Sequence, residues 1–200
     1  MNMKLVVAVL VMVLLGVFVG VQTTNNTDNE AGSISAVPTG GDFVLQSKHG
    51  KFDLKDYRGK LVLIYFGYTF CPDICPTNLS HLTQALNELN EAELSQIQPV
   101  FLSVDPERDS LEHLNNYVKY FHESLIGITG DEAMIADIAK KYGAAYKKVT
   151  GESEGGYLID HSSFTYLVDQ DGQLQESFQH ASDPLIMVKT IRNYLKRQPI

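Results

Sequence analysis

The only two cysteines of this 200-residue chain lie in one short stretch, GYTFCPDICP, at residues 67–76. Three residues separate Cys71 from Cys75, and a proline follows each of them. Cysteines this close in the chain can form a disulfide, bind a metal ion as thiolates, or carry out thiol–disulfide exchange. The choice among these three chemistries depends on the neighbouring residues and on the elements that hold the pair.

The two prolines constrain the backbone around the cysteines. A residue that precedes proline avoids the right-handed helical region, so we expect extended or turn conformations at both Cys71 and Cys75. After Pro76, leucine recurs at positions 79, 82, 86 and 89, which is helical spacing. The sequence therefore predicts a helix that begins at Pro76 with Cys75 as its N-cap, where the positive end of the helix dipole favours a thiolate.

From about residue 40 the chain alternates strand patterns with amphipathic helix patterns. Continuous apolar runs such as residues 61–66 suit strands that are buried on both faces. The expected elements, in order, are a hairpin (43–45 and 51–54), a strand (61–66), the helix after Pro76, a strand (99–104), a helix that starts near Asp109, a short strand (126–128), a helix (131–142), a hairpin (163–168 and 174–178) and a helix capped by Asp183.

This order predicts an α/β fold in which helices flank both faces of a mixed β-sheet, preceded by an N-terminal hairpin. The cysteine pair falls where the first buried strand meets its helix, and a β-hairpin and a helix close the chain. That arrangement is thioredoxin-like. We expect the globular domain to span residues 40–200.

One histidine favours metal binding over exchange at this site. The cysteine spacing is three residues rather than the two of the thiol oxidoreductase motif. A thioredoxin also has a proline before the strand that follows the last crossover, and here that place reads DHSSF (residues 160–164), without one. The fold would bring His161, in a loop, up to the cysteines. Two thiolates and an imidazole suit copper, as Cu(I) and also as Cu(II), whereas structural zinc normally takes four ligands and the chain has no further cysteine.

Other interpretations of the same residues stay open. Two cysteines in an exported domain are most often a structural disulfide, although so small a loop would add little stability. His161 could simply be hydrogen-bonded. Asp73, between the cysteines, could be a turn residue, a contact for a partner protein or a weak metal ligand. Asp105, at the end of the second buried strand, fits a turn or a helix start.

The N-terminus reads as a targeting segment. Residues 5–21 are all apolar, a run at the short end of what spans a bilayer. Lys4 precedes the run and no Lys or Arg follows before Lys48, so the positive-inside rule places the globular part outside the cytoplasm. We expect residues 1–21 to be an uncleaved transmembrane anchor, with a cleaved signal segment as the alternative, and residues 22–39 to be a flexible linker.

The charge of the chain bears on its partners. The formal net charge is −8 and the sequence contains no run of Lys and Arg. A surface that binds phosphate backbones needs clustered positive charge, so the composition argues against nucleic acid. Proteins and small ions are the expected partners.

Several motifs together resemble the Sco (SenC) family. They are Gly59-Lys60 leading into YFGYT (65–69), CPDICP (71–76), SVDPERD (103–109) and DHS (160–162). They occur in the order and with the spacing of that family, from about Gly41 to Leu195, which is essentially the whole globular part.

The resemblance implies a membrane-anchored, thioredoxin-like copper chaperone that delivers copper to the CuA centre of cytochrome c oxidase subunit II. It implies that Cys71, Cys75 and His161 bind the copper, and that Asp73 helps to present the site to the oxidase. It implies a metallochaperone rather than an enzyme, a thiol reductant as a further partner, and a globular domain on the periplasmic side of the inner (cytoplasmic) membrane.

Other functional classes remain as alternatives. Cys71 and Cys75 could be the redox pair of a thiol–disulfide reductase that keeps the cysteines of the acceptor reduced. A peroxiredoxin-type peroxidase fits less well, because its motif has a threonine three positions before the cysteine and Thr69 is two before Cys71. A copper sensor that acts only through its shape is the third alternative.

Overall fold

The computed structural model describes residues 38–150 and 156–197. The expected anchor (1–21), most of the expected linker (22–39) and nearly all of the loop at 151–156 lie outside these residues. Within the described ranges, no helix combines the length and apolar character needed to cross a membrane.

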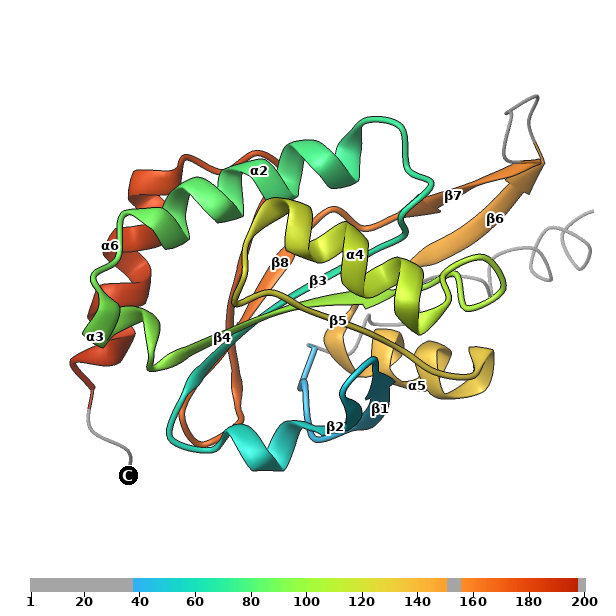
Figure 1. The fold of residues 1–200 in the computed structure, drawn as a ribbon. Helices are drawn as coiled ribbons and strands as arrows, with labels where there is room; N and C mark the ends of the chain where they lie inside the picture. Colours follow the sequence, from blue (N-terminus) through green and yellow to red (C-terminus); the bar gives the residue numbers. More distant parts are fainter. Residues whose placement is uncertain (1–37, 151–155, 198–200) are drawn as a thin grey trace, which may run out of the picture. The chain divides into compact units, whose positions relative to one another are not determined.

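A seven-stranded mixed sheet forms the centre of the domain, as the alternation of elements predicted (Figure 1). Its two central strands are parallel to each other, and every residue of β3 is buried, as its continuous apolar sequence predicted. The sheet has the order β2-β1-β5-β4-β3-β8-β9. The strands are β1 (Val44–Ser47), β2 (Gly50–Asp53), β3 (Leu61–Gly67), β4 (Ile97–Ser103), β5 (Ile126–Thr129), β8 (Thr165–Val168) and β9 (Leu174–Phe178).

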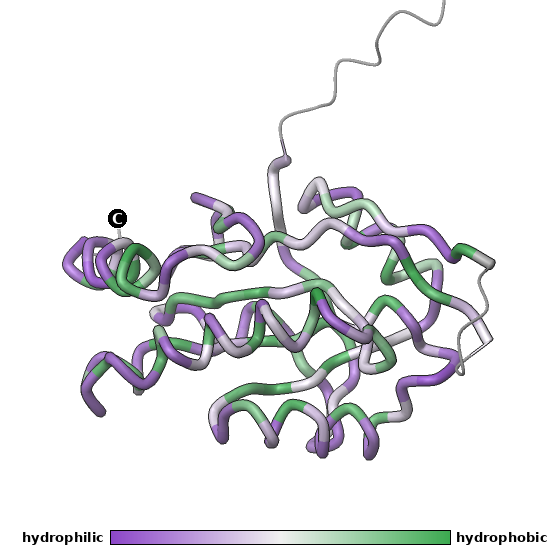
Figure 2. The backbone as a smooth tube through the Cα atoms, turned by 90° about the horizontal axis from the view of Figure 1, so that it is seen from above, coloured by the Kyte–Doolittle hydropathy of each residue, from purple (hydrophilic) through white to green (hydrophobic). Residues whose placement is uncertain are grey.

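Helices cover both faces of this sheet (Figure 1). On one face lie α2 (Ile74–Asn87), α4 (Leu111–Phe121) and α6 (Pro184–Leu195), and on the other lies α5 (Glu132–Tyr142). Two shorter helices, η1 (Leu54–Tyr57) and α3 (Glu91–Leu94), precede β3 and β4. The long helices alternate hydrophilic and hydrophobic residues around their axes, as expected of helices that bury one side (Figure 2).

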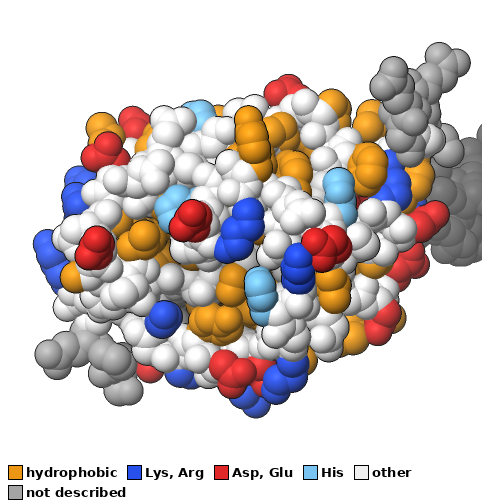
Figure 3. All heavy atoms as spheres, viewed as in Figure 1, with side chains coloured by type: hydrophobic (Ala, Val, Ile, Leu, Met, Phe, Trp, Pro, Cys, Tyr) orange, Lys and Arg blue, Asp and Glu red, His pale blue; other side chains and the backbone are white. Residues whose placement is uncertain are grey.

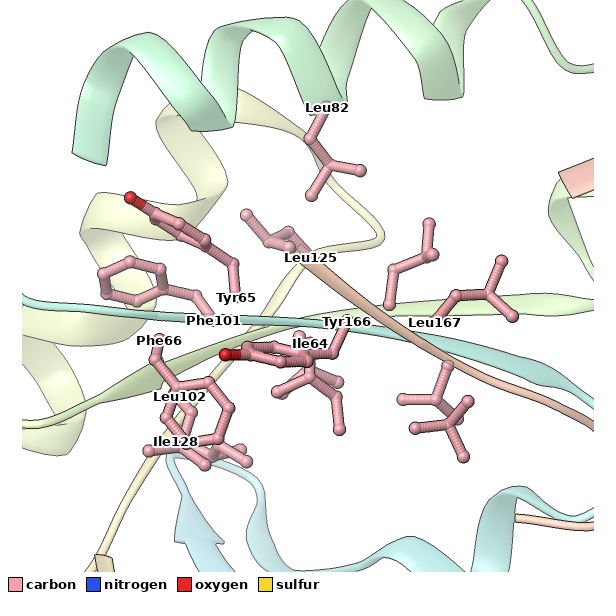
Figure 4. Packing of buried hydrophobic residues seen from close by; sticks show 14 of the residues in the cluster. Ile64, Tyr65, Phe66, Leu82, Phe101, Leu102, Leu125, Ile128, Tyr166 and Leu167 are labelled. Atoms are coloured by element: carbon pink, nitrogen blue, oxygen red, sulfur yellow. The ribbon is translucent and has the colours of Figure 1, made fainter. Parts of the chain in front are cut away.

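Side chains of β3 alternate between the two layers. Tyr65 lies on the same side of the sheet as Leu82 of α2, whereas Phe66 lies on the opposite side (Figure 4). There the ring of Phe66 packs against Tyr142 of α5, with 6.0 Å between ring centroids. The face that carries Tyr65 is therefore the face from which α2 and the cysteines approach.

Polar side chains cap the helices that follow the strands. Ser110, Asp131 and Asp183 each accept a hydrogen bond from a backbone N–H in the first turn of α4, α5 and α6 respectively. The predicted start of α4 at Asp109 is wrong by one residue, because Ser110 is the N-cap. The carboxylate of Asp109 is buried instead and serves the candidate site.

The predicted start of α2 at Pro76 is also wrong. The helix begins at Ile74 with Asp73 at the N-cap position, so Cys75 lies inside the first turn and not outside the helix. Proline is tolerated at Pro76 because the first four N–H groups of a helix have no partner within it. The N–H of Cys75 points instead at the sulfur of Cys71, 3.4 Å away. The thiol of Cys71 thus takes the capping role that had been assigned to Cys75.

A further hairpin, which sequence patterns did not predict, carries His161. Strands β6 (Tyr146–Thr150) and β7 (Tyr157–His161) pair only with each other, in a two-stranded sheet beside the loop that joins β3 to α2 (Figure 1). His161, expected in a loop, is the last residue of β7. The hydroxyl of Tyr68, in the β3–α2 loop, accepts a hydrogen bond from the N–H of Ile159, 3.2 Å away, and joins the hairpin to the cysteine segment.

Gly67 ends β3 directly beneath the thiol of Cys75. A Cβ atom at position 67 would lie 2.7 Å from the sulfur of Cys75 and 2.8 Å from Cε2 of Phe101. We therefore expect Gly67→Ala to lower the free energy of unfolding by about 1–3 kcal/mol, the usual cost of extra volume in a packed interior. Urea unfolding of the reduced protein measures this. An unchanged midpoint would mean that the thiol can move aside freely.

Candidate metal centre

Two segments from distant parts of the chain bring two thiols and an imidazole together. Cys71 and Cys75 come from the β3–α2 junction and His161 from the end of β7. One ligand atom from each lies within 4.8 Å of the others, and Cys75 Sγ is 3.3 Å from His161 Nε2. Both cysteines are free thiols. The structure thus assembles the three residues that the sequence singled out; that they bind a metal stays a prediction at this point.

The three side chains differ in their access to solvent. Cys75 is fully buried, Cys71 is 9% exposed, and His161 is half-buried. A cavity of about 400 Å³ opens onto Cys71 and His161 but not onto Cys75, and its walls are formed by the β3–α2 loop and by β7. An ion or a partner's side chain would therefore reach the sulfur of Cys71 first.

The two thiols have opposite pKa shifts. A hydrogen bond from the Cys75 thiol lowers the pKa of Cys71 although burial opposes the change. Burial raises the pKa of Cys75, and the nearby sulfur of Cys71 raises it further. These opposite shifts favour a thiolate at Cys71 and a proton on Cys75.

The imidazole of His161 is oriented with its acceptor nitrogen toward the sulfurs. Its Nδ1 lies 3.2 Å from the carbonyl oxygen of Ser162, and since a carbonyl only accepts, Nδ1 carries the proton. In the neutral ring Nε2 then has a free lone pair that faces Cys75. The rings of Tyr65 and Tyr68 pack edge-on against the imidazole, at centroid distances of 6.1 and 5.8 Å. This ring orientation is the one that a metal ligand needs.

Asp73 lies at the mouth of the cavity and outside the ligand group. It is exposed, occupies the N-cap position of α2, and accepts a hydrogen bond from the hydroxyl of Thr77 at 3.3 Å. Among the described residues, the only group of three side chains suited to hold a metal is Cys71, Cys75 and His161. The position of Asp73 therefore fits a turn and an exposed contact better than a ligand.

Asp109 supports the cysteine loop, a role that the sequence did not reveal. Its buried carboxylate accepts hydrogen bonds from the backbone N–H of Thr69 (3.1 Å), from the hydroxyl of Thr69 (2.5 Å) and from the hydroxyl of Ser103 (2.5 Å). These bonds fix the segment just before Cys71 to the end of β4. The sequence shows an acidic residue after a strand. The hydrogen-bond partners of that residue, Thr69 and Ser103, lie 40 and 6 residues away in the chain.

Arg108 joins the same loop to the hairpin that carries His161. Its guanidinium donates to the fully buried carboxylate of Asp105 at 2.5 Å and lies 3.6 Å from the ring centroid of Tyr157 in β7. It also donates to the backbone carbonyl of Tyr157 at 2.9 Å and lies 4.9 Å from the ring of Phe70. Asp105, predicted only as a turn or helix-start residue, is thus one half of a buried ion pair.

Tyr157 completes this connection from the side of the hairpin. Its hydroxyl donates to the other carboxylate oxygen of Asp105 at 2.6 Å. Burial, together with the negative charge of Asp105, raises the pKa of Tyr157 to about 12, so the hydroxyl keeps its proton and remains a donor. The loop of residues 105–109 therefore holds both ligand-bearing segments.

Comparisons with known proteins agree over most of the chain. The SCO1/SenC family model matches residues 31–196. An SCO2-like protein of Rickettsia conorii is 43% identical over 159 residues, which cover 78% of this chain and 77% of that protein. The copper-bound structure of ScoI from Bradyrhizobium japonicum is 36% identical with a TM-score of 0.71, covering 78% of this chain and 99% of that one. Copper-bound yeast Sco1 is 36% identical with a TM-score of 0.72, covering 82% and 91%. The predicted thioredoxin-like α/β fold is confirmed by this likeness.

The pKa asymmetry predicts selective alkylation. In the reduced, folded protein at about pH 5, iodoacetamide should modify Cys71 and spare Cys75, because only the thiolate reacts. Cys75→Ala should slow the labelling of Cys71 at this pH, since it removes the hydrogen bond that lowers the pKa. Peptide mass spectrometry measures both, with urea-unfolded protein as the control in which the two cysteines react alike. Faster labelling of Cys75 would contradict the assignment.

The buried ion pair predicts a large stability difference between two variants. Arg108→Met leaves the carboxylate of Asp105 buried without its cation, and we expect it to lower the free energy of unfolding by about 3–5 kcal/mol. Lys141→Met is the matched control, because the Lys141–Asp137 pair is of similar length, 2.6 Å, but lies in solvent; it should cost less than about 1 kcal/mol. Equal costs in urea unfolding would contradict the role given to Arg108.

Proposed function

This chain belongs to the SCO1/SenC family, and from that premise we propose that it is a copper metallochaperone. It binds one copper ion through Cys71, Cys75 and His161 and delivers it to the CuA centre of cytochrome c oxidase subunit II. The observation that carries the proposal is the cluster itself: two free thiols and a correctly oriented imidazole within 4.8 Å, at the base of an open cavity.

The chemistry of the donor set favours copper over other metals. Thiolates are soft ligands that select Cu(I), and imidazole suits both Cu(I) and Cu(II). A structural zinc site would normally have four protein ligands, and the described residues supply three here. Three ligands also suit a transient cargo, because the ion stays open to a ligand from an acceptor.

Loading and delivery follow from the order in which the ligands can be reached. The thiols must first be reduced, which requires a thiol reductant as a partner. Copper then meets the more accessible thiolate of Cys71, and binding to Cys75 releases the remaining proton of the pair. On delivery, a cysteine of the acceptor enters from the cavity and displaces these ligands stepwise. Cys75, fully buried, is the last to release the ion.

The rim of the cavity suits contact with a protein acceptor. Phe70 and Ile74, on either side of Cys71, are 43% and 38% exposed, and Asp73 lies between the cysteines at the surface. On the face shown in Figure 3, acidic and basic side chains are interspersed. An acceptor that docks by apolar contact at the rim fits this surface better than nucleic acid does.

The N-terminal sequence supports a membrane location. The apolar run 5–21 would anchor the chain in the inner membrane, with residues 22–39 as a tether and residues 40–200 as the copper-binding domain. The charge pattern around the run places that domain on the periplasmic side. This location would bring the site close to an oxidase in the same membrane.

One observation favours a second function, a thiol–disulfide reductase that keeps the acceptor's cysteines reduced. The more accessible thiolate of Cys71 and the fully buried thiol of Cys75 have the arrangement of an attacking and a resolving cysteine. Thiol–disulfide reduction does not require His161, so the effect of replacing His161 distinguishes the two functions.

Copper titration tests the proposed function. Reduced wild-type protein should bind one Cu(I) in competition with a chelator, and Cys71→Ser, Cys75→Ser and His161→Ala should each weaken binding by more than about 100-fold, beyond the usual effect of losing a group that only supports a ligand. His180→Ala, an exposed histidine outside the cavity, is the control and should leave the affinity unchanged.

Parallel assays distinguish the two functions. If the chain acts only as a reductase, His161→Ala should keep full disulfide-reducing activity and a copper affinity within a few-fold of the wild type. That result would contradict the three-ligand metallochaperone. Loss of copper binding in all three variants, with slow disulfide reduction by the wild type, is the expected outcome.

A further inference from the structure

Tyr65 lies on β3 below the candidate metal centre, and the proposed function gives it no role. It lies on β3 two residues before Gly67, so both face the α2 side of the sheet. The sulfur of Cys75 sits directly over Gly67, 2.7 Å from where a Cβ would be. The ring of Tyr65 is also 6.1 Å from that of His161. Tyr65 therefore lies beside two of the three candidate ligands.

The hydroxyl of Tyr65 is buried without a satisfactory partner. The residue has no exposed surface, and among the described residues its oxygen makes no hydrogen bond of normal geometry. In Figure 4 the ring stands off the sheet beside Phe101, with the oxygen at its far end. Buried hydroxyl groups are nearly always hydrogen-bonded in folded proteins, so an unsatisfied one calls for an explanation.

The thiolate of Cys75, which forms when a metal ion binds, would supply the hydrogen-bond acceptor that the Tyr65 hydroxyl lacks. Cys75 is a free cysteine, and a thiol sulfur is a weak acceptor. A coordinated cysteine is a thiolate, which accepts hydrogen bonds strongly. Burial and the proximity of Cys75 raise the pKa of Tyr65, so its hydroxyl keeps the proton that it would donate.

We propose that the hydroxyl of Tyr65 donates a hydrogen bond to the Cys75 thiolate when the site holds copper, and that it thereby tunes this ligand. The inference rests on the proposed function. The hydrogen bond draws electron density from the sulfur, which weakens its donation to Cu(II) and stabilises the negative charge on the ligand. Tyr65 is thus a positioning residue that acts through Cys75 and does not touch the ion.

A second tyrosine provides a matched control. Tyr117 on α4 also has a buried hydroxyl without a partner among the described residues, and its ring is 5.5 Å from Phe101, which Tyr65 contacts as well. Tyr65→Phe and Tyr117→Phe each remove one unsatisfied oxygen from the same layer and leave the ring in place. Tyr65 lies on β3 two residues before Gly67, over which the Cys75 sulfur sits, whereas Tyr117 lies on α4.

The experiment compares these two variants with the wild type in three measurements on the purified, reduced protein. For Tyr65→Phe we expect Cu(I) affinity to fall about tenfold, the lower end of what supporting groups contribute. We expect the thiolate-to-Cu(II) charge-transfer band to move to longer wavelength, because the sulfur becomes a better donor. Tyr117→Phe should match the wild type in both. In wild-type protein loaded with Cu(I), NMR should show the Tyr65 hydroxyl proton moved downfield from its position in the metal-free protein, as expected of a new hydrogen bond.

Each outcome decides a different point. Tyr65→Phe with the affinity and band of the wild type, or a Tyr117→Phe variant that shifts both equally, would overturn this inference and leave the proposed function intact. The NMR measurement needs no variant, and a Tyr65 hydroxyl proton at the same position in the loaded and the metal-free protein would also overturn the inference. A wild-type protein that takes up no copper would overturn the proposed function and this inference with it.

Discussion

The centre exists because two segments 86 residues apart in the chain are held at contact distance. Neither the cysteine loop nor the β6–β7 hairpin belongs to the seven-stranded sheet, and a two-stranded hairpin is marginally stable by itself. The buried pair of Asp105 and Arg108 supplies the connection, because Arg108 stacks on Tyr157 of the hairpin and lies over Phe70 of the loop. Asp109 then fixes the same loop to the end of β4. A single five-residue turn thus sets the distance between the sulfurs and the imidazole.

The residues of the centre were easier to predict than the structure that holds them. Cys71, Cys75 and His161 could be named from the sequence, because few residue types do this chemistry and the strand–helix order places both segments at one edge of the sheet. The buried strands and the N-caps of α5 and α6 also followed from local patterns. Arg108 and Asp109 could not be assigned, since charged residues after a strand suggest an exposed turn until their partners are known.

The wrong start of α2 and the unpredicted strands β6 and β7 also result from tertiary contacts, which local sequence patterns do not show. Cys75 precedes a proline, and the local preference places it outside a helix, yet the sulfur of Cys71 accepts its N–H and lets the helix start earlier. The strands β6 and β7 are rich in polar residues and lack the apolar alternation of a sheet strand. They pair because Arg108 and Tyr68 bind them to the domain, which no window of sequence reveals.

Cys71 and Cys75 differ in burial and in pKa because their surroundings differ, and this difference suits the proposed role as a copper carrier. Cys71 faces the cavity and is stabilised as a thiolate, whereas Cys75 is enclosed and protonated. The two sulfurs and the imidazole nitrogen lie within 4.8 Å of one another, held by contacts of the surrounding chain, and preorganisation of this kind strengthens affinity. In the proposed function, the open side at Cys71 would keep the ion within reach of an acceptor's sulfur. Tight binding would then depend on the fully buried Cys75 and transfer on the more accessible Cys71, so a single centre could hold copper and still release it to a competing pair of thiolates.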